Sequence, residues 1–150
     1  MAKKKTTTKR RVQLYLLYIE DRVVHTINDV EILSPTLKQV LEAVRRLNGK
    51  NTTLIKIDLG RKHLTIGGGN EGRYIALLTQ IKAGEESFSN LLRSKAPAKA
   101  SDQELAVVAG RQCGLYPRRQ VVDLKTVLRA ARCFAQYGTR CPSLIWEKQA

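Results

Sequence analysis

The clearest periodic pattern of apolar and polar positions lies in the last thirty residues. Between residues 124 and 137, apolar side chains recur at the i, i+3, i+4, i+7 spacing of an amphipathic helix. Asp123 precedes this run as an N-cap, and Gly138 follows it as a C-terminal stop. After a loop, a short final strand ends in the only tryptophan, and the alternation places Leu144 and Trp146 on one face, which predicts packing on the core. The apolar helix face comprises Leu124, Val127, Leu128, Ala131, Phe134 and Ala135, and the opposite face carries Lys125, Arg129, Arg132 and Gln136.

The first half of the chain predicts two strands followed by another helix. Residues 12–19 alternate imperfectly and are rich in Val, Leu, Tyr and Ile, and after a turn residues 23–32 indicate a partly polar second strand. Ser34 then supplies a capping hydroxyl, and Pro35 suits the first helical position. The helix that follows ends at residues 48–49. Its buried stripe comprises Leu37, Val40, Leu41, Val44 and Leu47.

The middle of the chain predicts a series of hairpins. Residues 52–59 alternate between apolar and polar side chains, which is typical of a strand with one face on the core. A turn leads to a strand at residues 63–66, a glycine-rich loop and a further strand at residues 73–81. Consecutive strands with short connections favour an antiparallel meander.

The region before the last helix has a weaker pattern. Residues 84–100 are small and polar, which indicates a variable and mobile segment compatible with a short helix near residues 87–92. Residues 105–109 indicate a strand, and residues 110–119 indicate a loop. Together these elements predict an α+β fold, in which an antiparallel β-sheet, or meander, has two main helices packed on one face.

Length and composition indicate one domain and exclude a membrane-spanning helix. A chain of 150 residues with 43% hydrophobic content suits a single folded domain, which we place at residues 12–150. No run of about 18 apolar residues exists, so we expect no membrane partner. The basic N-terminus is followed by threonines rather than by an apolar stretch. We therefore expect no secretory signal and a cytoplasmic location.

Basic residues are concentrated at the two ends of the chain. Lys and Arg number 27 against 13 Asp and Glu, and residues 1–11 hold six basic and no acidic side chains. Residues 105–150 hold eight basic and two acidic side chains, whereas residues 12–104 are nearly balanced. We interpret residues 1–11 as a disordered basic arm, which either keeps the protein soluble or contacts nucleic acid nonspecifically.

The three cysteines do not form a metal-binding pattern. Cys113, Cys133 and Cys141 lack the paired spacing of a structural zinc site, so we predict reduced thiols and no metal. Cys133 falls near the edge of the apolar helix face and is expected to be packed. Cys113 and Cys141 are expected in loops, and the sequence leaves open whether either of them is reactive.

The glycine-rich loop matches a nucleotide-binding spacing without its context. Gly67, Gly69 and Gly72 satisfy G-x-G-x-x-G, but a dinucleotide site requires a helix after the glycines, whereas residues 73–79 continue as a strand. The glycines therefore favour a tight hairpin. No zinc-deaminase or serine-hydrolase motif appears, so we expect no enzymatic activity, no catalytic residues and no cofactor.

Several polar and basic side chains suit contact with a protein partner. A stiff glycine hairpin presents the side chains at its tip with little ordering cost, and we expect Asn70 and Glu71 to be exposed there. Arginine and tyrosine are over-represented among the residues that dominate protein interfaces. The alternative is a charged face that only keeps the protein soluble. The candidate partner-binding residues are Asn70, Glu71, Arg73, Tyr116, Arg118, Arg119, Arg129 and Arg132.

The C-terminal motifs resemble a known family. Residues 121–134, V-V-D-L-x-T-x-L-R-A-A-R-x-F, and residues 142–147, P-S-L-x-W-E, resemble the tail of immunity proteins from bacterial polymorphic-toxin systems, in the first-numbered family of the Imm series. The glycine-rich residues 64–74 and Pro117 are similar to that family as well. The resemblance runs from Leu54 to the C-terminus.

This resemblance implies a small cytoplasmic α+β protein that binds a cognate toxin domain and neutralises it by occluding its active site. Related toxins include nucleic-acid deaminases and nucleases. Because the family is defined by its scaffold, the resemblance implies no catalytic residues. Cys141 stands where relatives often carry an acidic residue, so an acidic contact at that corner is not expected.

The alternative function is that of a basic nucleic-acid-binding accessory protein. It would use residues 1–11 and the arginine-rich C-terminal face. The low aromatic content of 5% argues against a stacking platform for single strands. The sequence indicates neither the toxin nor the oligomeric state.

Overall fold

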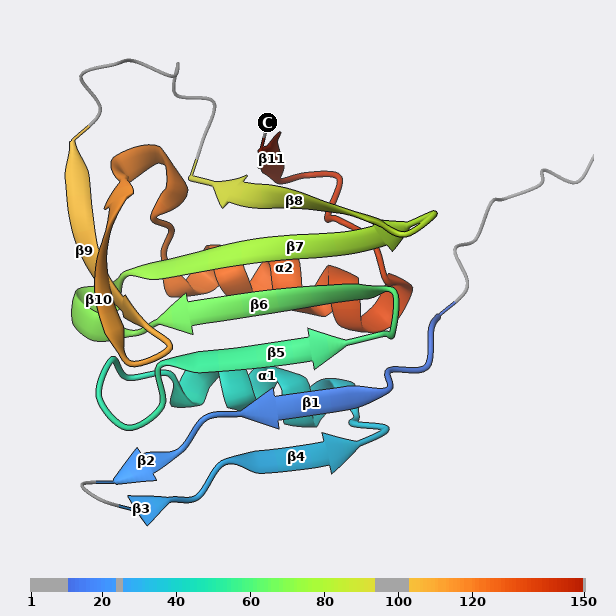
Figure 1. The fold of residues 1–150 in the computed structure, drawn as a ribbon, viewed down its shortest axis with the longest axis horizontal. Coiled ribbons are helices and arrows are strands. Elements are labelled where there is room, and N and C mark those ends of the chain that lie inside the picture. The colour runs from blue at the N-terminus through green and yellow to red at the C-terminus, as the bar shows by residue number, and fades with distance from the viewer. Residues whose placement is uncertain (1–10, 24–25, 94–102, 150) are drawn as a thin grey trace, which may run out of the picture.

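The computed structural model describes residues 11–23, 26–93 and 103–149, so the predicted basic arm lies almost wholly outside the described residues. A seven-stranded antiparallel sheet runs through the molecule (Figure 1). Its strands are β1 (Leu16–Ile19), β4 (Val30–Leu33), β5 (Leu54–Asp58), β6 (Lys62–Gly68), β7 (Tyr74–Lys82), β8 (Glu85–Leu92) and β11 (Ile145–Lys148). Their order in space is β11–β8–β7–β6–β5–β1–β4.

The predicted meander is confirmed, because β5, β6, β7 and β8 are neighbours both in sequence and in space. The alternation of residues 52–59 places one side of β5 on the core. Ile55 pairs with Ile66, and Ile57 pairs with Leu64, and all four side chains are buried. This register carries the apolar face continuously from one strand to the next.

The C-terminal strand completes the sheet at its β8 edge. Trp146 of β11 lies opposite Leu91 of β8 in the register. Leu144 and Trp146 both pack against the hydrophobic core, which confirms the prediction from their alternation. The strand continues past the tryptophan as far as Lys148, two residues further than its pattern predicted.

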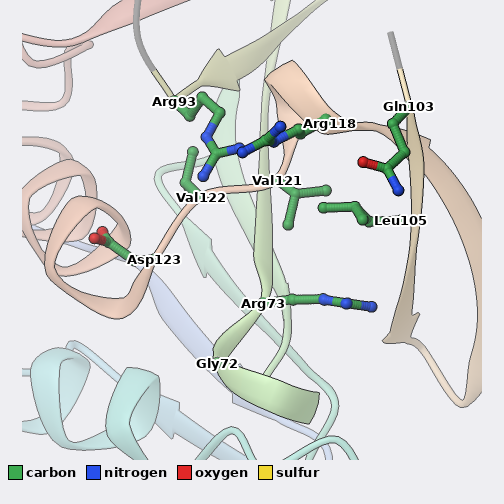
Figure 2. A pocket seen from close by; sticks show the side chains of 9 residues that line it. All are labelled: Gly72, Arg73, Arg93, Gln103, Leu105, Arg118, Val121, Val122 and Asp123. Carbon is green, nitrogen blue, oxygen red and sulfur yellow. The ribbon is translucent and has the colours of Figure 1, made fainter.

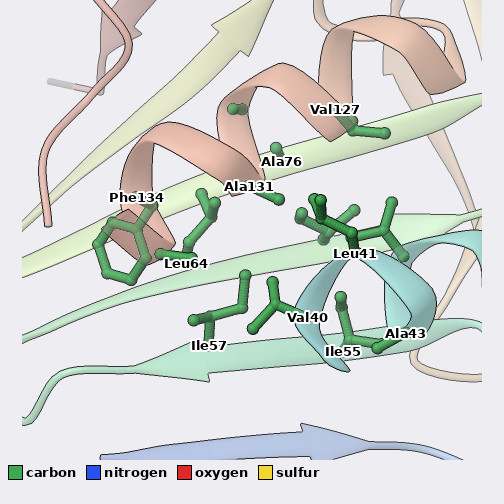
Figure 3. Close-up of a cluster of buried hydrophobic side chains, with 14 of the residues drawn as sticks. Val40, Leu41, Ala43, Ile55, Ile57, Leu64, Ala76, Val127, Ala131 and Phe134 are labelled. Carbon is green, nitrogen blue, oxygen red and sulfur yellow. The ribbon is translucent and has the colours of Figure 1, made fainter. Parts of the chain in front are cut away.

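Both helices cover the same face of the sheet, as predicted (Figure 1). α1 spans Leu37–Arg46 and α2 spans Leu124–Tyr137, and the two helices contact each other. Figure 3 shows Phe134 of α2 beside Leu64 of β6, within the buried cluster. Burying a side chain of this size contributes about 1.5–3 kcal/mol relative to leaving it exposed. In the described ranges, no helix is long and apolar enough to cross a membrane.

The boundaries of α2 follow its predicted signals. The carboxylate of Asp123 accepts a hydrogen bond from the backbone N–H of Thr126 at 2.9 Å. At the other end, Gly138 adopts the left-handed conformation with φ of 68° and donates its N–H to the carbonyl of Phe134. The predicted N-cap and C-terminal stop are therefore both confirmed.

The start of α1 was predicted two residues too early. Ser34 has a positive φ of 49°, which is incompatible with an N-cap conformation. Thr36 is the N-cap: its hydroxyl accepts from the N–H of Gln39 at 3.1 Å, and the Gln39 side chain accepts from the N–H of Thr36 at 2.9 Å. This reciprocal capping box replaces the single hydroxyl expected from Ser34.

The two N-terminal strands are shorter than predicted. Of residues 12–19, only β1 joins the sheet, and residues 23–32 divide into β3 (Thr26–Ile27) and β4. β2 (Arg22–Val23) pairs with β3 in a small separate ribbon. The carboxylate of Asp29 connects this ribbon to the end of β1. It accepts hydrogen bonds from the Tyr18 hydroxyl, the Arg22 guanidinium and the Asp21 N–H.

The prediction of a short helix near residues 87–92 is wrong, because these residues belong to strand β8. A two-residue turn at Ala83 and Gly84, with φ of 52° and 80°, returns the chain antiparallel to β7. Ser89 and Leu91 face the core, so the segment has a two-residue period that its polar composition conceals. The rest of the segment that was expected to be mobile, residues 94–100, lies outside the described residues.

The loop predicted at residues 110–119 is also wrong. Strands β9 (Glu104–Ala109) and β10 (Gln112–Pro117) form a hairpin joined at Gly110 and Arg111, whose φ values are 64° and 68°. Positive φ at both central residues is typical of a tight two-residue hairpin turn. β10 is stabilised by pairing with β9 and none of its residues is buried, which explains its weak apolar pattern. The 3₁₀ turn η2 (Arg118–Gln120) follows and leads into α2.

Candidate functional site

The β9–β10 hairpin stands at the end of the sheet where β6 passes into β7, and its strands run across those of the sheet (Figure 1). The glycine-rich sequence between β6 and β7 folds into the 3₁₀ turn η1 (Asn70–Gly72). Gly68 has φ of 117°, and a Cβ there would come within 2.3 Å of the Arg73 carbonyl oxygen. The tight hairpin predicted from the glycines is therefore present.

Asn70 fixes the hairpin to the sheet. Its amide donates to the carbonyl of Ala106 at 3.2 Å, and its carbonyl oxygen accepts from the N–H of Val108 at 2.9 Å. Arg73 adds a second hydrogen bond to the same Ala106 carbonyl at 3.2 Å. The exposure predicted for Asn70 is wrong, because its side chain is half-buried and hydrogen-bonded to β9, whereas Glu71 is exposed as expected.

A buried polar group fixes the far end of the hairpin. The carboxylate of Glu20, which is only 3% exposed, accepts from the N–H and the hydroxyl of Thr53 at 2.8 and 2.6 Å. The Thr53 hydroxyl oxygen in turn accepts from the N–H of Arg111 at 2.9 Å. Buried polar networks with satisfied partners rigidify their surroundings. The hairpin is therefore held at two points and presents a fixed surface.

A pocket of about 350 Å³ opens between this hairpin and the start of α2. Figure 2 shows Arg93 and Arg118 at the same end of this pocket, with Arg73 entering from the η1 side. The backbone N–H of Arg93 donates to the carbonyl of Arg119 at 2.8 Å, so the segments that carry Arg93 and Arg118 are neighbours. We call this the arginine pocket. Its lining comprises Gly72, Arg73, Arg93, Gln103, Leu105, Arg118, Val121, Val122 and Asp123.

Asp123 is the one acidic residue among the described residues of the lining, and it does not neutralise the arginines. The Asp123 carboxylate accepts from the N–H and hydroxyl of Thr126, and these hydrogen bonds lower the pKa of Asp123. Figure 2 shows that carboxylate directed towards the helix and away from Arg93 and Arg118. In the part of the chain that the structure describes, no carboxylate pairs with either of these two guanidinium groups. The described residues of the lining therefore carry a net positive charge.

The candidate residues predicted from sequence fall into two groups. Arg73 and Arg118 line the pocket, Glu71 forms an ion pair with Arg73 at 3.6 Å, and Asn70 anchors the adjoining strand. The other four lie beyond its lining. Tyr116 is half-buried on β10, Arg119 pairs with Glu147 at 3.3 Å, and Arg129 and Arg132 lie on the exposed face of α2.

Arg93, Gln103 and Leu105 were not predicted as site residues. Arg93 directly follows β8 and Gln103 precedes β9, so a stretch of chain separates them in the sequence. No spacing rule connects positions that meet only when the β9–β10 hairpin folds back over η1. The one available signal was the change from apolar Leu92 to a basic residue at the end of a strand.

The C-terminal corner holds two of the three cysteines. Cys141 lies in a loop, as expected, and is buried there, with its thiol 3.3 Å from the Ser143 hydroxyl. Cys113, also expected in a loop, is instead an exposed residue of strand β10. Burial of the Cys141 thiol raises its pKa, but hydrogen bonds involving Cys133 and Ser143 outweigh it, so that the pKa is lowered overall. Arg129 also donates to Ser143. Across the described residues, no three His, Cys, Asp or Glu side chains are grouped to hold a metal ion.

Comparison with known protein families identifies the class as that of the immunity proteins. Residues 28–148 match the family described as Immunity protein Imm1, and the chain belongs to this family. The resemblance seen in residues 54–150 is thereby confirmed and extended towards the N-terminus. Immunity proteins of this family act against polymorphic toxins and are generally non-enzymatic. No curated protein and no solved structure matches the chain.

Proposed function

We propose that this protein binds a cognate polymorphic toxin and occludes its active site with the surface around the arginine pocket. The observation that carries the proposal is the gathering of Arg73 and Arg118 at a rigid end of the molecule. A fixed surface loses little conformational entropy on binding, so more of its contact energy contributes to affinity. Membership of the Imm1 family indicates that the partner is a toxin.

The charge of the chain suggests how occlusion is achieved. Nucleic-acid deaminases and nucleases bind polyanionic substrates with basic surfaces, and this chain has a formal net charge of +14. Two basic surfaces repel each other. We therefore infer that the chain docks on an acidic surface beside the substrate groove and blocks the groove by overlap. Complementary charge would then accelerate the encounter.

The proposal is tested by titrating the full-length chain against the toxin domain encoded beside it. We expect inhibition that is complete at a one-to-one ratio, together with a complex that elutes as one species in gel filtration. A toxin from an unrelated system, assayed in parallel, should remain active. Full toxin activity in the presence of excess chain would contradict the proposal.

The nucleic-acid-binding alternative gives a different result in the same assay. It predicts protection that requires no protein complex and that is accompanied by binding to generic DNA or RNA, through residues 1–11 and the arginine-rich C-terminal face. Protection that persists after deletion of residues 1–11 favours the immunity protein, whereas nucleic-acid binding that survives the deletion at moderate salt favours the alternative. The comparison also shows whether the arm contributes to neutralisation.

A further inference from the structure

We infer that the arginine pocket binds carboxylate side chains from an acidic segment of the toxin, an inference that rests on the proposed function. The first observation is that Arg93 and Arg118 line the same pocket from neighbouring segments, since the N–H of Arg93 donates to the carbonyl of Arg119 at 2.8 Å (Figure 2). Two like charges in one pocket repel each other. A carboxylate between them removes this repulsion and offers two oxygens to their planar donor groups.

The third arginine has a different role. Arg73 donates to the carbonyl of Ala106 and pairs with Glu71, so part of its donor capacity is already used within the molecule. It contributes positive charge to the pocket while it helps to hold β9 in place. We therefore assign ligand binding to Arg93 and Arg118, and positioning to Arg73.

The apolar part of the lining favours a side-chain carboxylate over a phosphate group. Val121 and Val122 are buried at 4% and 3% exposure, and Leu105 is half-buried beside them. In Figure 2, Val121 and Leu105 lie between Arg73 and the other two arginines. The methylene groups of an aspartate or glutamate can pack on these side chains, whereas a phosphate group has no apolar surface to offer.

The start of α2 also argues against a phosphate. Phosphate groups commonly bind to free N–H groups at a helix N-terminus. Here the Asp123 carboxylate already accepts from the Thr126 N–H at 2.9 Å and places its own negative charge at that position. The lining contains no aromatic ring on which a nucleic-acid base could stack. The volume of about 350 Å³ suits a few side chains of one protein segment.

The test measures how tightly full-length variants bind the neighbouring toxin domain. The double variant R93Q/R118Q removes two exposed positive charges from the pocket, and the matched control K38Q/R45Q removes two from the exposed face of α1. We expect the dissociation constant to rise by about 10- to 100-fold in the pocket variant, mainly through faster dissociation. The control should change by less than about threefold, because exposed charges outside an interface contribute little.

Three small probes identify the chemistry of the pocket. A short acetylated oligoglutamate peptide, inorganic phosphate and a short DNA duplex are each titrated into the protein while the arginine side-chain NMR signals are recorded. We expect the peptide to shift the Arg93 and Arg118 signals at lower concentration than phosphate or DNA does. A stronger response to phosphate or DNA would overturn the assignment to carboxylates.

The outcomes separate the inference from the proposed function. Equal toxin binding by R93Q/R118Q and K38Q/R45Q would overturn the inference and leave the proposed function standing. Failure of the unmodified chain to bind the toxin would instead overturn the proposed function. Thermal unfolding of each variant serves as the folding control, and the expected result is the same transition temperature for both double variants.

Discussion

At the scale of single residues, the amide side chain of Asn70 connects the η1 turn to strand β9. It makes one hydrogen bond as a donor to Ala106 and one as an acceptor from Val108. Arg73 also donates to the Ala106 carbonyl, so the Val108 N–H is the group that depends on Asn70 alone. The position of one wall of the arginine pocket therefore rests on this side chain.

Replacing Asn70 by alanine should destabilise the protein and loosen the hairpin. The partly buried Val108 N–H would lose its partner, which costs about 1–3 kcal/mol of unfolding free energy. Glu71→Gln is the matched control, since its exposed ion pair with Arg73 should contribute less than about 1 kcal/mol. Urea denaturation of both variants measures the difference. Equal stability would show that the Asn70 hydrogen bonds do not hold β9.

Gly68 is required for a steric reason that does not apply to Gly72. A Cβ at Gly68 would meet the Arg73 carbonyl oxygen at 2.3 Å, whereas no atom lies within 4 Å of a Cβ at Gly72. Both residues have positive φ. We expect Gly68→Ala to cost more than about 2 kcal/mol and Gly72→Ala to cost about 1 kcal/mol. Denaturant titration measures the unfolding free energy of both variants. A larger loss of stability for Gly72→Ala than for Gly68→Ala would contradict the structure.

Asp29 should make the stability of the N-terminal ribbon depend on pH. Hydrogen bonds from Arg22, followed by those from Tyr18 and the Asp21 N–H, hold the pKa of this carboxyl well below its ordinary value of 3.8. Because the folded pKa is depressed, the stabilisation is complete above the unfolded pKa and is lost as the pH falls through the folded value.

Asp29→Asn should therefore lower the urea midpoint near neutral pH, and the deficit should shrink as the pH falls below 3.8. Glu42→Gln, on the exposed face of α1, controls for the removal of one negative charge. Urea midpoints of the three proteins across the acidic range provide the measurement. A deficit that grows on acidification would show that the assigned hydrogen bonds are wrong.

At the scale of elements, the start of α1 gives a test of the corrected helix boundary. Thr36 and Gln39 form a reciprocal capping box, whereas Ser34 lies outside the helix. Thr36→Ala should cost about 0.5–2 kcal/mol of unfolding free energy. Ser34→Ala should change stability by less than about 0.5 kcal/mol. Thermal or urea unfolding of the two variants separates them, and a larger effect at Ser34 would restore the boundary expected from the sequence.

The sequence predicted correctly those elements whose boundaries and buried face are encoded in their own residues. α2 has an apolar stripe, the N-cap Asp123 and the C-terminal Gly138, and both of its ends were predicted correctly. β10 was missed because none of its residues is buried and its hydrogen-bonding partner is β9. β8 was misread because Ser89, a buried polar residue, hides the alternation. Pairing across the sheet determined these two strands more than their composition did.

At the scale of the whole molecule, the candidate site depends on the arrangement of distant segments. Arg73 and Arg118 were predicted from their residue types, and the fold brings both of them to one pocket. Arg93 was missed, because its proximity to Arg118 arises from the path of β8 and η2 rather than from a motif. The family match covers residues 28–148 and agrees with the predicted class of protein. The site residues themselves remain predictions.

The central claim is that the end of the molecule around the arginine pocket contacts the toxin. Hydrogen–deuterium exchange of the full-length chain, alone and in a one-to-one complex with the neighbouring toxin domain, tests it most directly. We predict slower exchange in η1, β9, β10 and η2, while the amides of β4, at the opposite edge of the sheet, keep their rates. Protection confined to β4 would contradict the account.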